Sequence, residues 1–297
     1  MPGQRRSRSP SVDPDQSNKR QEVAIASPSR ADHSPNSQPG SPSSSTFKYK
    51  GNEYTLFQPW ELLSLDALIF TQKHSISQLQ EANYFILNNS DPRMLGCRFK
   101  AEDFTVMPAY DPSQEKLRYV TIRCSHVECN GNSREVAHIT VLNLINGEEI
   151  INSYVWPNSP VTQWDLDQWD QTMSKDVLVN ASLEGGVLLG WEAVGRKLAQ
   201  YVDAETIFVG YGLGYDLKAL RISHKNVFDF LIALRNCPMS DEALKGTPYD
   251  QYPKPPLTQR TTLGAKGRSG YYERALAYRE NAINCLKRPW GAYRIWS

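Results

Sequence analysis

The sequence contains no long apolar run. Runs such as residues 186–190 fall far short of the roughly 20 apolar residues that cross a bilayer. No apolar segment follows the arginines near the N-terminus, which argues against a secretory signal. The chain also has almost no excess of charge, with a formal net charge of +1, so any basic surface must be local. We therefore expect an intracellular protein of the nucleus or cytoplasm, with no membrane as a partner.

Cysteine is scarce and odd in number. Five cysteines without a secretory signal predict reduced thiols. Cys124 and Cys129 flank His126, which suggests zinc, but no second Cys/His pair follows at the spacing of a zinc finger. We interpret both cysteines as small thiols on strands.

Large apolar residues are almost absent from residues 1–46. Such a segment cannot bury enough surface to offset its chain entropy, so it is predicted to be a disordered tail. Ser-Pro pairs begin at Ser9, Ser27, Ser34 and Ser41. Phosphorylation of these serines would make the tail acidic, whereas the alternative is a passive solvated tail.

Residues 47–116 have helical periodicity in two places. Pro59 stands at the first position of a predicted helix that continues to Phe70, and a second helix is predicted from Ser75 to Leu87. We expect a helical accessory segment that packs on the rest of the chain, with a groove for a protein partner as the alternative. A protein partner would bind these helices and the tail.

Residues 117–297 have the pattern of an α/β domain. Antiparallel strands followed by helix, strand, helix and strand indicate a mixed sheet flanked by helices. Asn146 and Gly147 predict a tight turn between two of the strands. The strands are predicted at residues 117–124, 136–144, 150–156, 206–209 and 226–230, and the helices at 191–202, 216–222 and 273–287.

Residues 210–220 read Gly-Tyr-Gly-Leu-Gly-Tyr-Asp-Leu-Lys-Ala-Leu, with Asp216 as their carboxylate. This segment resembles the second motif of the DEDD superfamily of 3′-5′ exonucleases, in particular the Rex-type RNA exonucleases, although Tyr211 replaces the motif's histidine. Residues 154–162 and 221–229 continue the likeness. The resemblance covers roughly residues 119–236 and, more weakly, the last helix, and it implies an RNase H-like fold.

The family's chemistry uses four acids that hold two divalent ions for phosphodiester cleavage. In the alignment that the resemblance implies, the first motif's Asp and Glu fall on Arg123 and Ser125, and the last motif's Asp falls on Asn281. Asp216 is the remaining acid at a motif position, and the family's general base is missing. The resemblance therefore implies a degenerate site, in which we expect Arg123 to pair with Asp216.

The residues leave three interpretations open. In the first, the chain is an inactive exonuclease-like protein without a cofactor, which acts by binding single-stranded RNA, another nucleic acid or a protein. In the second, it is an active 3′-5′ RNA exonuclease that holds Mg²⁺ or Mn²⁺ with rearranged ligands, Asp216 together with Glu280 or Glu128. In the third, it is an interaction scaffold that binds no nucleic acid.

A group of basic residues follows Asp216 in the sequence. Lys218, Arg221, His224 and Lys225 form a predicted basic rim that could hold a phosphate backbone electrostatically. The alternative for these four residues is a solvated charged face.

Overall fold

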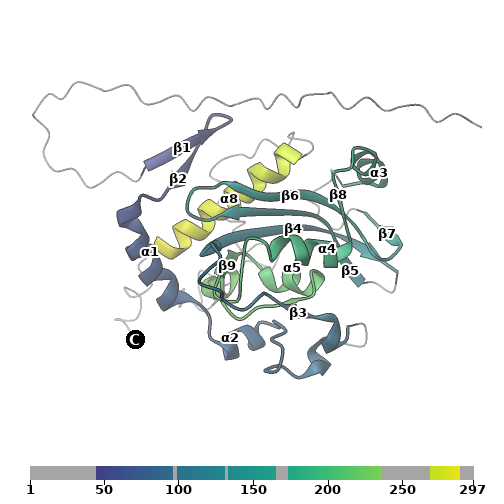
Figure 1. Ribbon diagram of the computed structural model, residues 1–297, viewed down its shortest axis with the longest axis horizontal. Helices are drawn as coiled ribbons and strands as arrows, with labels where there is room; N and C mark the ends of the chain where they lie inside the picture. Colours follow the sequence, from purple (N-terminus) through teal and green to yellow (C-terminus); the bar gives the residue numbers. More distant parts are fainter. Residues whose placement is uncertain (1–44, 96–98, 131–132, 165–172, 236–267, 288–297) are drawn as a thin grey trace, which may run out of the picture. The chain divides into compact units, whose positions relative to one another are not determined.

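A seven-stranded mixed sheet organises the described part of the chain (Figure 1). Its strands are β4 (Tyr119–Cys129), β5 (Ser133–Asn143), β6 (Glu149–Trp156), β7 (Val161–Gln163), β8 (Val187–Leu189), β9 (Ile207–Gly210) and β11 (Val227–Asp229). β4, β5 and β6 are antiparallel neighbours, while β9 adds parallel to β4 and β11 adds parallel to β9. β8 pairs parallel with β6, and β7 pairs antiparallel with β4. The predicted α/β class and RNase H-like sheet are confirmed.

The structure is a computed structural model, and it describes residues 45–95, 99–130, 133–164, 173–235 and 268–287. The predicted disordered tail therefore lies almost entirely outside the described residues. Within these ranges, no helix combines the length and the apolar character that crossing a membrane requires.

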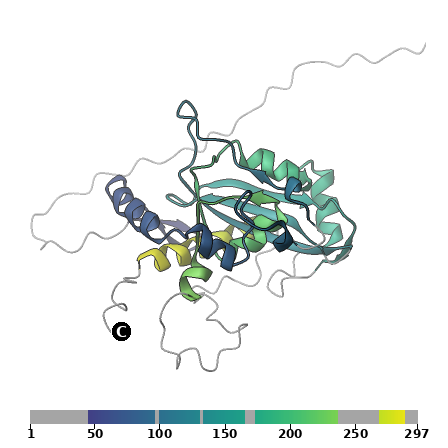
Figure 2. The ribbon, with the colours of Figure 1, turned by 90° about the horizontal axis from the view of Figure 1, so that it is seen from below.

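Helices cover both faces of the sheet (Figures 1 and 2). α4 (Gly190–Leu198) and α5 (Leu213–Ala219) share an apolar core with Val120 and Ile122 of β4. α8 (Arg268–Lys287) packs on the opposite face, in a second core with Tyr119 of β4. Because side chains alternate along a strand, β4 directs its even-numbered residues to the α5 face and its odd-numbered residues to the α8 face. The remaining helices of the domain are α3 (Lys175–Leu183) and α6 (Phe230–Arg235).

The predicted turn at Asn146 and Gly147 joins β5 to β6. Gly147 has a φ of +74° and donates its N–H to the Asn143 carbonyl at 2.9 Å. Glycine adopts this left-handed conformation without a steric penalty. A Cβ atom at this position would also lie 2.6 Å from the Phe47 ring, so the turn needs glycine for close approach as well as for its dihedral angle.

The segment before β4 is not helical throughout. It begins with a hairpin that the sequence analysis did not predict, and two helices follow at the predicted places. β3 (Thr105–Val106) pairs parallel with β10 (Ile222–Ser223), which ties the segment to the domain. Its elements are β1 (Ser45–Tyr49), β2 (Asn52–Leu56), α1 (Pro59–Gln72), α2 (Ile76–Glu81), 3₁₀ turns at Pro92–Leu95 and Ala101–Asp103, and β3 (Thr105–Val106).

α2 ends at Glu81 rather than at the predicted Leu87. Asn83 has a φ of +62°, a left-handed conformation that asparagine tolerates better than most residues. The N–H of Asn83 donates to Gln80 and that of Tyr84 to Leu79, each at 2.9 Å. These two bonds form the Schellman motif that stops a helix, and they turn Tyr84 toward the domain.

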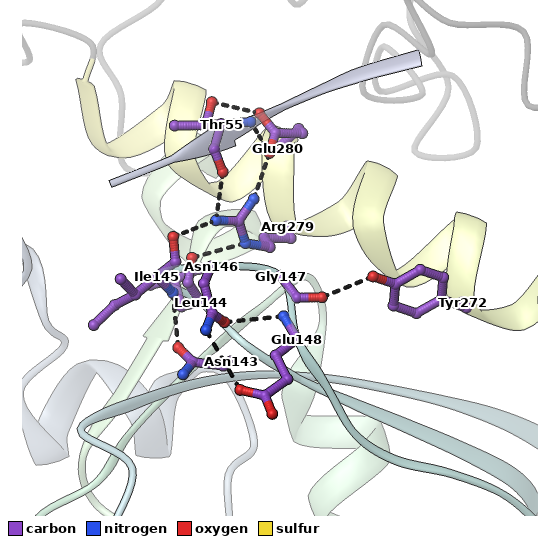
Figure 3. Close-up of polar contacts among 10 residues, drawn as sticks. All are labelled: Thr55, Asn143, Leu144, Ile145, Asn146, Gly147, Glu148, Tyr272, Arg279 and Glu280. Atoms are coloured by element: carbon purple, nitrogen blue, oxygen red, sulfur yellow. Dashed lines mark hydrogen bonds and ion pairs between the residues drawn. The ribbon is translucent and has the colours of Figure 1, made fainter. Parts of the chain in front are cut away.

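A buried arginine holds the hairpin, the β5–β6 turn and α8 together (Figure 3). Arg279 of α8 is 0% exposed. Its Nε donates to the Leu144 carbonyl at 2.7 Å, and its Nη2 donates to Thr55 O at 2.8 Å and Ile145 O at 2.9 Å. Burial lowers the pKa of Arg279 to about 10, which still leaves the guanidinium charged at neutral pH.

Glu280 completes the same network. Its Oε1 accepts from Arg279 Nη1 at 2.6 Å and from the Thr55 N–H at 2.9 Å, and its Oε2 accepts from the Thr55 hydroxyl at 2.7 Å. Tyr272 adds a hydrogen bond from its hydroxyl to the Gly147 carbonyl at 2.9 Å. A charge buried this deeply is tolerated only when its donors are paired, so these three elements depend on one another.

We predict that Arg279→Met lowers the free energy of unfolding by about 3–5 kcal/mol, the usual result of removing one partner of a buried pair. The Glu280 carboxylate and three carbonyls would each lose a donor. Urea denaturation of the full chain measures the change. Arg196→Met, an exposed arginine of α4, is the control and should stay within about 0.5 kcal/mol of the original chain. Equal stability of the two variants would refute the role of the network.

Candidate functional site

Asp216 lies on α5 and faces β4. The helix begins after Gly212, whose φ is +65°, and Asp216 is only 2% exposed. Its Oδ1 lies 3.2 Å from Nε2 of His126. The contact is close but is not an aligned hydrogen bond, because Nε2 has no well-directed acceptor. Asp216 is therefore placed against an imidazole and not against a second carboxylate.

The alternation of β4 explains this arrangement. Cys124 belongs to the core that β4 shares with α5, and His126 reaches Asp216 from the same face. Burial raises the pKa of the Cys124 thiol, and the charge of Asp216 raises it further. This thiol therefore stays protonated and is no candidate nucleophile.

Arg123 and Ser125 point to the opposite face of the sheet. The guanidinium of Arg123 lies 5.0 Å from the centre of the Tyr278 ring of α8. Ser125 pairs in register with His138, whose ring stacks on Tyr271 of α8 at 3.6 Å. Asp216 lies on the face of the sheet that His126 occupies, and Arg123 is an odd number of residues away from His126 on the same strand, so it faces the other side. The predicted ion pair between Arg123 and Asp216 is therefore wrong.

The two α8 candidates also lie apart from Asp216. Both carboxylate oxygens of Glu280 are bonded to Thr55 or Arg279, so the prediction of Glu280 as a metal ligand beside Asp216 is wrong. Asn281 is half-buried on α8, on the side of the sheet that Arg123 faces. The motif positions thus divide into a set at α8 and the single acid Asp216 at α5.

Asp229, at the end of β11, is a buried acid whose role the sequence analysis missed. Its Oδ2 accepts from the Tyr84 hydroxyl at 2.6 Å, and its Oδ1 accepts from the N–H groups of Gly212 at 2.8 Å and Leu231 at 2.9 Å. Burial raises its pKa although these bonds favour the charged form. Asp229 thereby fixes the loop that leads into α5, and the sequence offered only the segment around it as a signal.

Tyr84 closes the same region from the accessory segment. Its ring packs on α5, where a Cβ atom at Gly214 would lie 3.0 Å from it. Burial raises the pKa of Tyr84 well above its usual value, and the charges of Asp229 and Asp216 add to the effect. The hydroxyl is therefore a permanent hydrogen-bond donor at this site.

These residues do not fit the two-ion centre that the family resemblance implies. Mg²⁺ and Mn²⁺ prefer several oxygen ligands, whereas Asp216 meets an imidazole and a buried thiol. The Asp229 oxygens are already used by Tyr84 and two backbone amides. Among the residues that the structure describes, no three His, Cys, Asp or Glu side chains are arranged to hold a metal ion.

Only some residues of the predicted basic rim are accessible to solvent. Lys218 is half-buried with its Nζ 5.8 Å from the Phe99 ring, and burial lowers its pKa. The guanidinium of Arg221 lies 5.0 Å from Phe99 and 4.8 Å from Trp191, and its Nη1 is 3.6 Å from Asp103. We call Phe99, Trp191, Lys218 and Arg221 the aromatic–cation cluster.

His224 is not part of a surface, so its prediction as a nucleic-acid contact is wrong. It is 4% exposed, its Nε2 lies 2.7 Å from the Thr206 carbonyl, and its ring stacks on Phe208 at 4.0 Å. Burial lowers its pKa to about 4. Lys225, the next residue, is exposed.

A cleft of about 520 Å³ lies where β4 and β9 begin. It contains none of the predicted site residues, and its walls carry charges of both signs, such as Lys116 and Glu205. Arg118 and Asp66 in its lining already pair with each other at 2.6 Å. The cleft thus has no set of like charges for one kind of ion.

Comparison with known proteins shows which proteins this chain is similar to. No protein-family model matches the chain. It is 23% identical to RNA exonuclease 3 of Candida albicans over 155 residues, which cover 51% of this chain and 34% of that protein. It is 48% identical to the putative RNA exonuclease pqe-1 of Caenorhabditis elegans over 50 residues, 17% of this chain and 3% of that protein. The chain carries a domain related to the DEDD-type 3′-5′ exonucleases.

A solved structure with a matching region is the Pan2 catalytic unit of Neurospora crassa, with protease and nuclease domains. The match has a TM-score of 0.39 and 14% identity, and it covers 70% of this chain and 31% of that one. This chain spans about a third or less of the length of the curated relatives described above. The similarity to RNA exonucleases therefore concerns only part of each of those proteins.

The buried His224 makes stability depend on pH. An unfolded histidine titrates near pH 6.5, so below that value the unfolded chain binds a proton that the folded chain refuses. The free energy of unfolding should fall as the pH drops from about 6.5 toward 4. His224→Gln keeps an N–H donor for Thr206 and removes this dependence.

Urea denaturation at about pH 7.5 and about pH 4.5 measures the effect, and the original chain should lose about 2 kcal/mol more than His224→Gln between them. Other buried groups, such as His74 and Asp229, titrate in both proteins and cancel in the comparison. Equal losses in the two proteins would contradict the assignment of a neutral His224.

Proposed function

We propose that this chain is an exonuclease-like protein that binds single-stranded RNA and does not cleave it. The observation that carries the proposal is the position of Asp216, which faces His126 while Arg123 and Ser125 face the other side of the sheet. A two-ion site requires acids that converge on one point. Of the motif positions, one acid lies on one face, and a cation with a hydroxyl lies on the other.

Magnitudes favour the loss of hydrolysis. Removing a general base alone costs about 10²–10⁴-fold in rate, and the family's base has no counterpart in this sequence. Two divalent ions carry four positive charges, which one carboxylate in contact with an imidazole does not balance. Glu280 cannot move toward Asp216 without breaking its bonds to Thr55 and Arg279.

The aromatic–cation cluster supports the binding part of the proposal. Tyr215 is 67% exposed, and it lies three residues before Lys218, so the two are neighbours on the surface of α5. Arg221 follows at the end of this helix, between Phe99 and Trp191. One exposed ring and two half-buried rings beside cations suit the bases and phosphates of a single strand, and the names of the relatives favour RNA.

The test uses a labelled single-stranded RNA with the full chain, in Mg²⁺ and separately in Mn²⁺. We predict binding that weakens as salt rises, with no shortening of the RNA. Tyr215→Ala should weaken binding about 5-fold or more, since a stacked base contributes about 1–3 kcal/mol. Lys218→Gln should reduce the slope of log K against log salt by about 0.7.

Lys48→Gln is the matched control, because Lys48 lies on β1 in a surface pair with Glu53 at 3.3 Å. Metal-dependent shortening from the 3′ end that disappears in Asp216→Asn would instead support an active exonuclease. Absence of both binding and shortening would leave a protein scaffold. The exposed apolar residues of α1 are the observation that favours the protein scaffold as the second candidate function.

A further inference from the structure

The cleft where β4 and β9 begin contains two buried side chains with an unused oxygen atom. Its volume of about 520 Å³ is within the range of ligand sites, about 300–1,000 Å³. Asp203 and Asn226 line it although they are only 4% and 7% exposed. No described residue donates to Oδ2 of Asp203 or to Oδ1 of Asn226, and neither atom is enclosed by the protein. Both oxygens therefore open into the cleft and can accept from a ligand.

The loop before β9 fixes the orientation of Asp203. Its Oδ1 accepts from the N–H groups of Glu205 at 2.9 Å and Thr206 at 3.0 Å. The Asp203 N–H donates to the Thr206 hydroxyl at 3.0 Å, and this hydroxyl donates to the Leu117 carbonyl at 2.7 Å. One oxygen of the carboxylate is thus bound inside the loop, and Oδ2 is left for a donor from outside.

Asn226 is held against the same loop. Its Nδ2 donates to the Ala204 carbonyl at 2.8 Å, and its own carbonyl accepts from the Phe208 N–H at 2.9 Å. The amide therefore directs Oδ1 away from Ala204. Since Ala204 follows Asp203 in the chain, the two unused oxygens flank one short, fully bonded loop. Acceptors fixed in this way bind a donor without a cost for ordering them.

Tyr110 adds an aromatic ring to the cleft. The Ala204 N–H donates to the Pro108 carbonyl at 2.7 Å, which brings the segment with Tyr110 beside the loop. Tyr110 lines the cleft and is 61% exposed. Among the residues that the structure describes, no cation or other ring lies against it. Its face is therefore available to a planar or cationic group.

The cations of the cleft are mostly engaged by the protein. Arg118 pairs with Asp66, and the Lys116 Nζ donates to the carbonyls of residues 199 and 200 at 3.0 Å and 2.9 Å. Glu115 and Glu205 are exposed at the cleft, and no cation of the described residues pairs with either. A bare ion would still meet charges of both signs. A cation that carries its own N–H donors is different, because directed hydrogen bonds hold it at the Asp203 end.

We propose that this cleft binds an arginine side chain in a peptide segment of a partner protein. A guanidinium is a planar fork of N–H donors. It can donate to Asp203 Oδ2 and Asn226 Oδ1 while its face lies on the Tyr110 ring. A lysine ammonium is a point charge and lacks this plane. The cleft has room for more than one guanidinium, so the residues next to the arginine fit as well. None of its lining residues belongs to the aromatic–cation cluster.

Calorimetric titration of the full chain with short capped peptides tests the proposal. Each peptide has one central residue between glycines: arginine, lysine or citrulline, which is the neutral counterpart of arginine. We expect the arginine peptide to bind, the lysine peptide to bind about 5-fold or more weakly, and the citrulline peptide about 10-fold or more weakly. Free arginine amide should also bind more weakly than the arginine peptide, because it lacks the flanking residues.

Two variants test the contacts. Asp203→Asn should weaken the arginine peptide at least about 10-fold, because hydrogen bonds to a charged group are strong and the two loop amides hold the new amide oxygen at Oδ1, which leaves its N–H₂ facing the guanidinium. Tyr110→Leu should weaken it about 3-fold. Tyr110 is exposed, so this variant tests the site even if Asp203→Asn loosens the loop. Circular dichroism checks the fold of both.

Glu184→Gln is the control, since it removes an exposed acid at the end of α3 that does not line the cleft, and it should bind the arginine peptide normally. RNA binding should be the same in all variants, so the result does not depend on the proposed function. The proposal is overturned if the arginine peptide does not bind, if the lysine or citrulline peptide or free arginine amide binds as tightly, or if both cleft variants bind like the original chain.

Discussion

The guanidinium of Arg279 is the interaction on which the arrangement of the domain depends. It is fully buried and reaches carbonyls from β2 and from the β5–β6 turn, while Glu280 accepts from it on the same helix. A charge in such a place costs several kcal/mol unless every donor is paired. The hairpin, the turn and α8 must therefore assemble together. This requirement fixes which side of α8 faces the sheet, and it commits Glu280 to a structural bond.

The period of two along β4 is the second constraint, because it divides the candidate site. Cys124 and His126 face α5, so Asp216 finds an imidazole and a thiol. Arg123 faces α8 and lies over Tyr278. No rotation of side chains can bring these two sets together across a sheet. The alternation of side chains along β4 keeps the motif residues on separate faces. A single substitution at one motif position would therefore not restore a cluster of acids.

Much of the fold could be predicted from local sequence patterns. Asn146 and Gly147 predicted the turn, and apolar periodicity predicted the central strands and α1. The hairpin before α1 was missed because its strands are short and its stability comes from Arg279, more than 200 residues away in sequence. The end of α2 was misplaced because the apolar pattern continues through Ile86, although Asn83 stops the helix.

The site was harder to predict than the fold, because it depends on which face each residue takes. His224 has polar and charged neighbours in the sequence, yet its ring stacks on Phe208 in the core. Asp229 belongs to a segment that the resemblance included, but its bond to Tyr84 comes from an accessory segment that the resemblance does not cover.

The accessory segment before β4 closes the region beside Asp216 and also exposes an apolar helix face. Its Tyr84 packs against Gly214 and bonds Asp229, so it closes the region beside Asp216 with groups that are already paired. Its α1 leaves Trp60, Leu63 and Phe70 exposed to solvent, and exposure of their apolar surface to water is unfavourable in free energy. The hydroxyl of Tyr84 is thus bonded inside the domain, whereas the outer face of α1 is exposed. Both features support the proposal that the chain binds at its surface rather than catalysing a reaction at the buried acid.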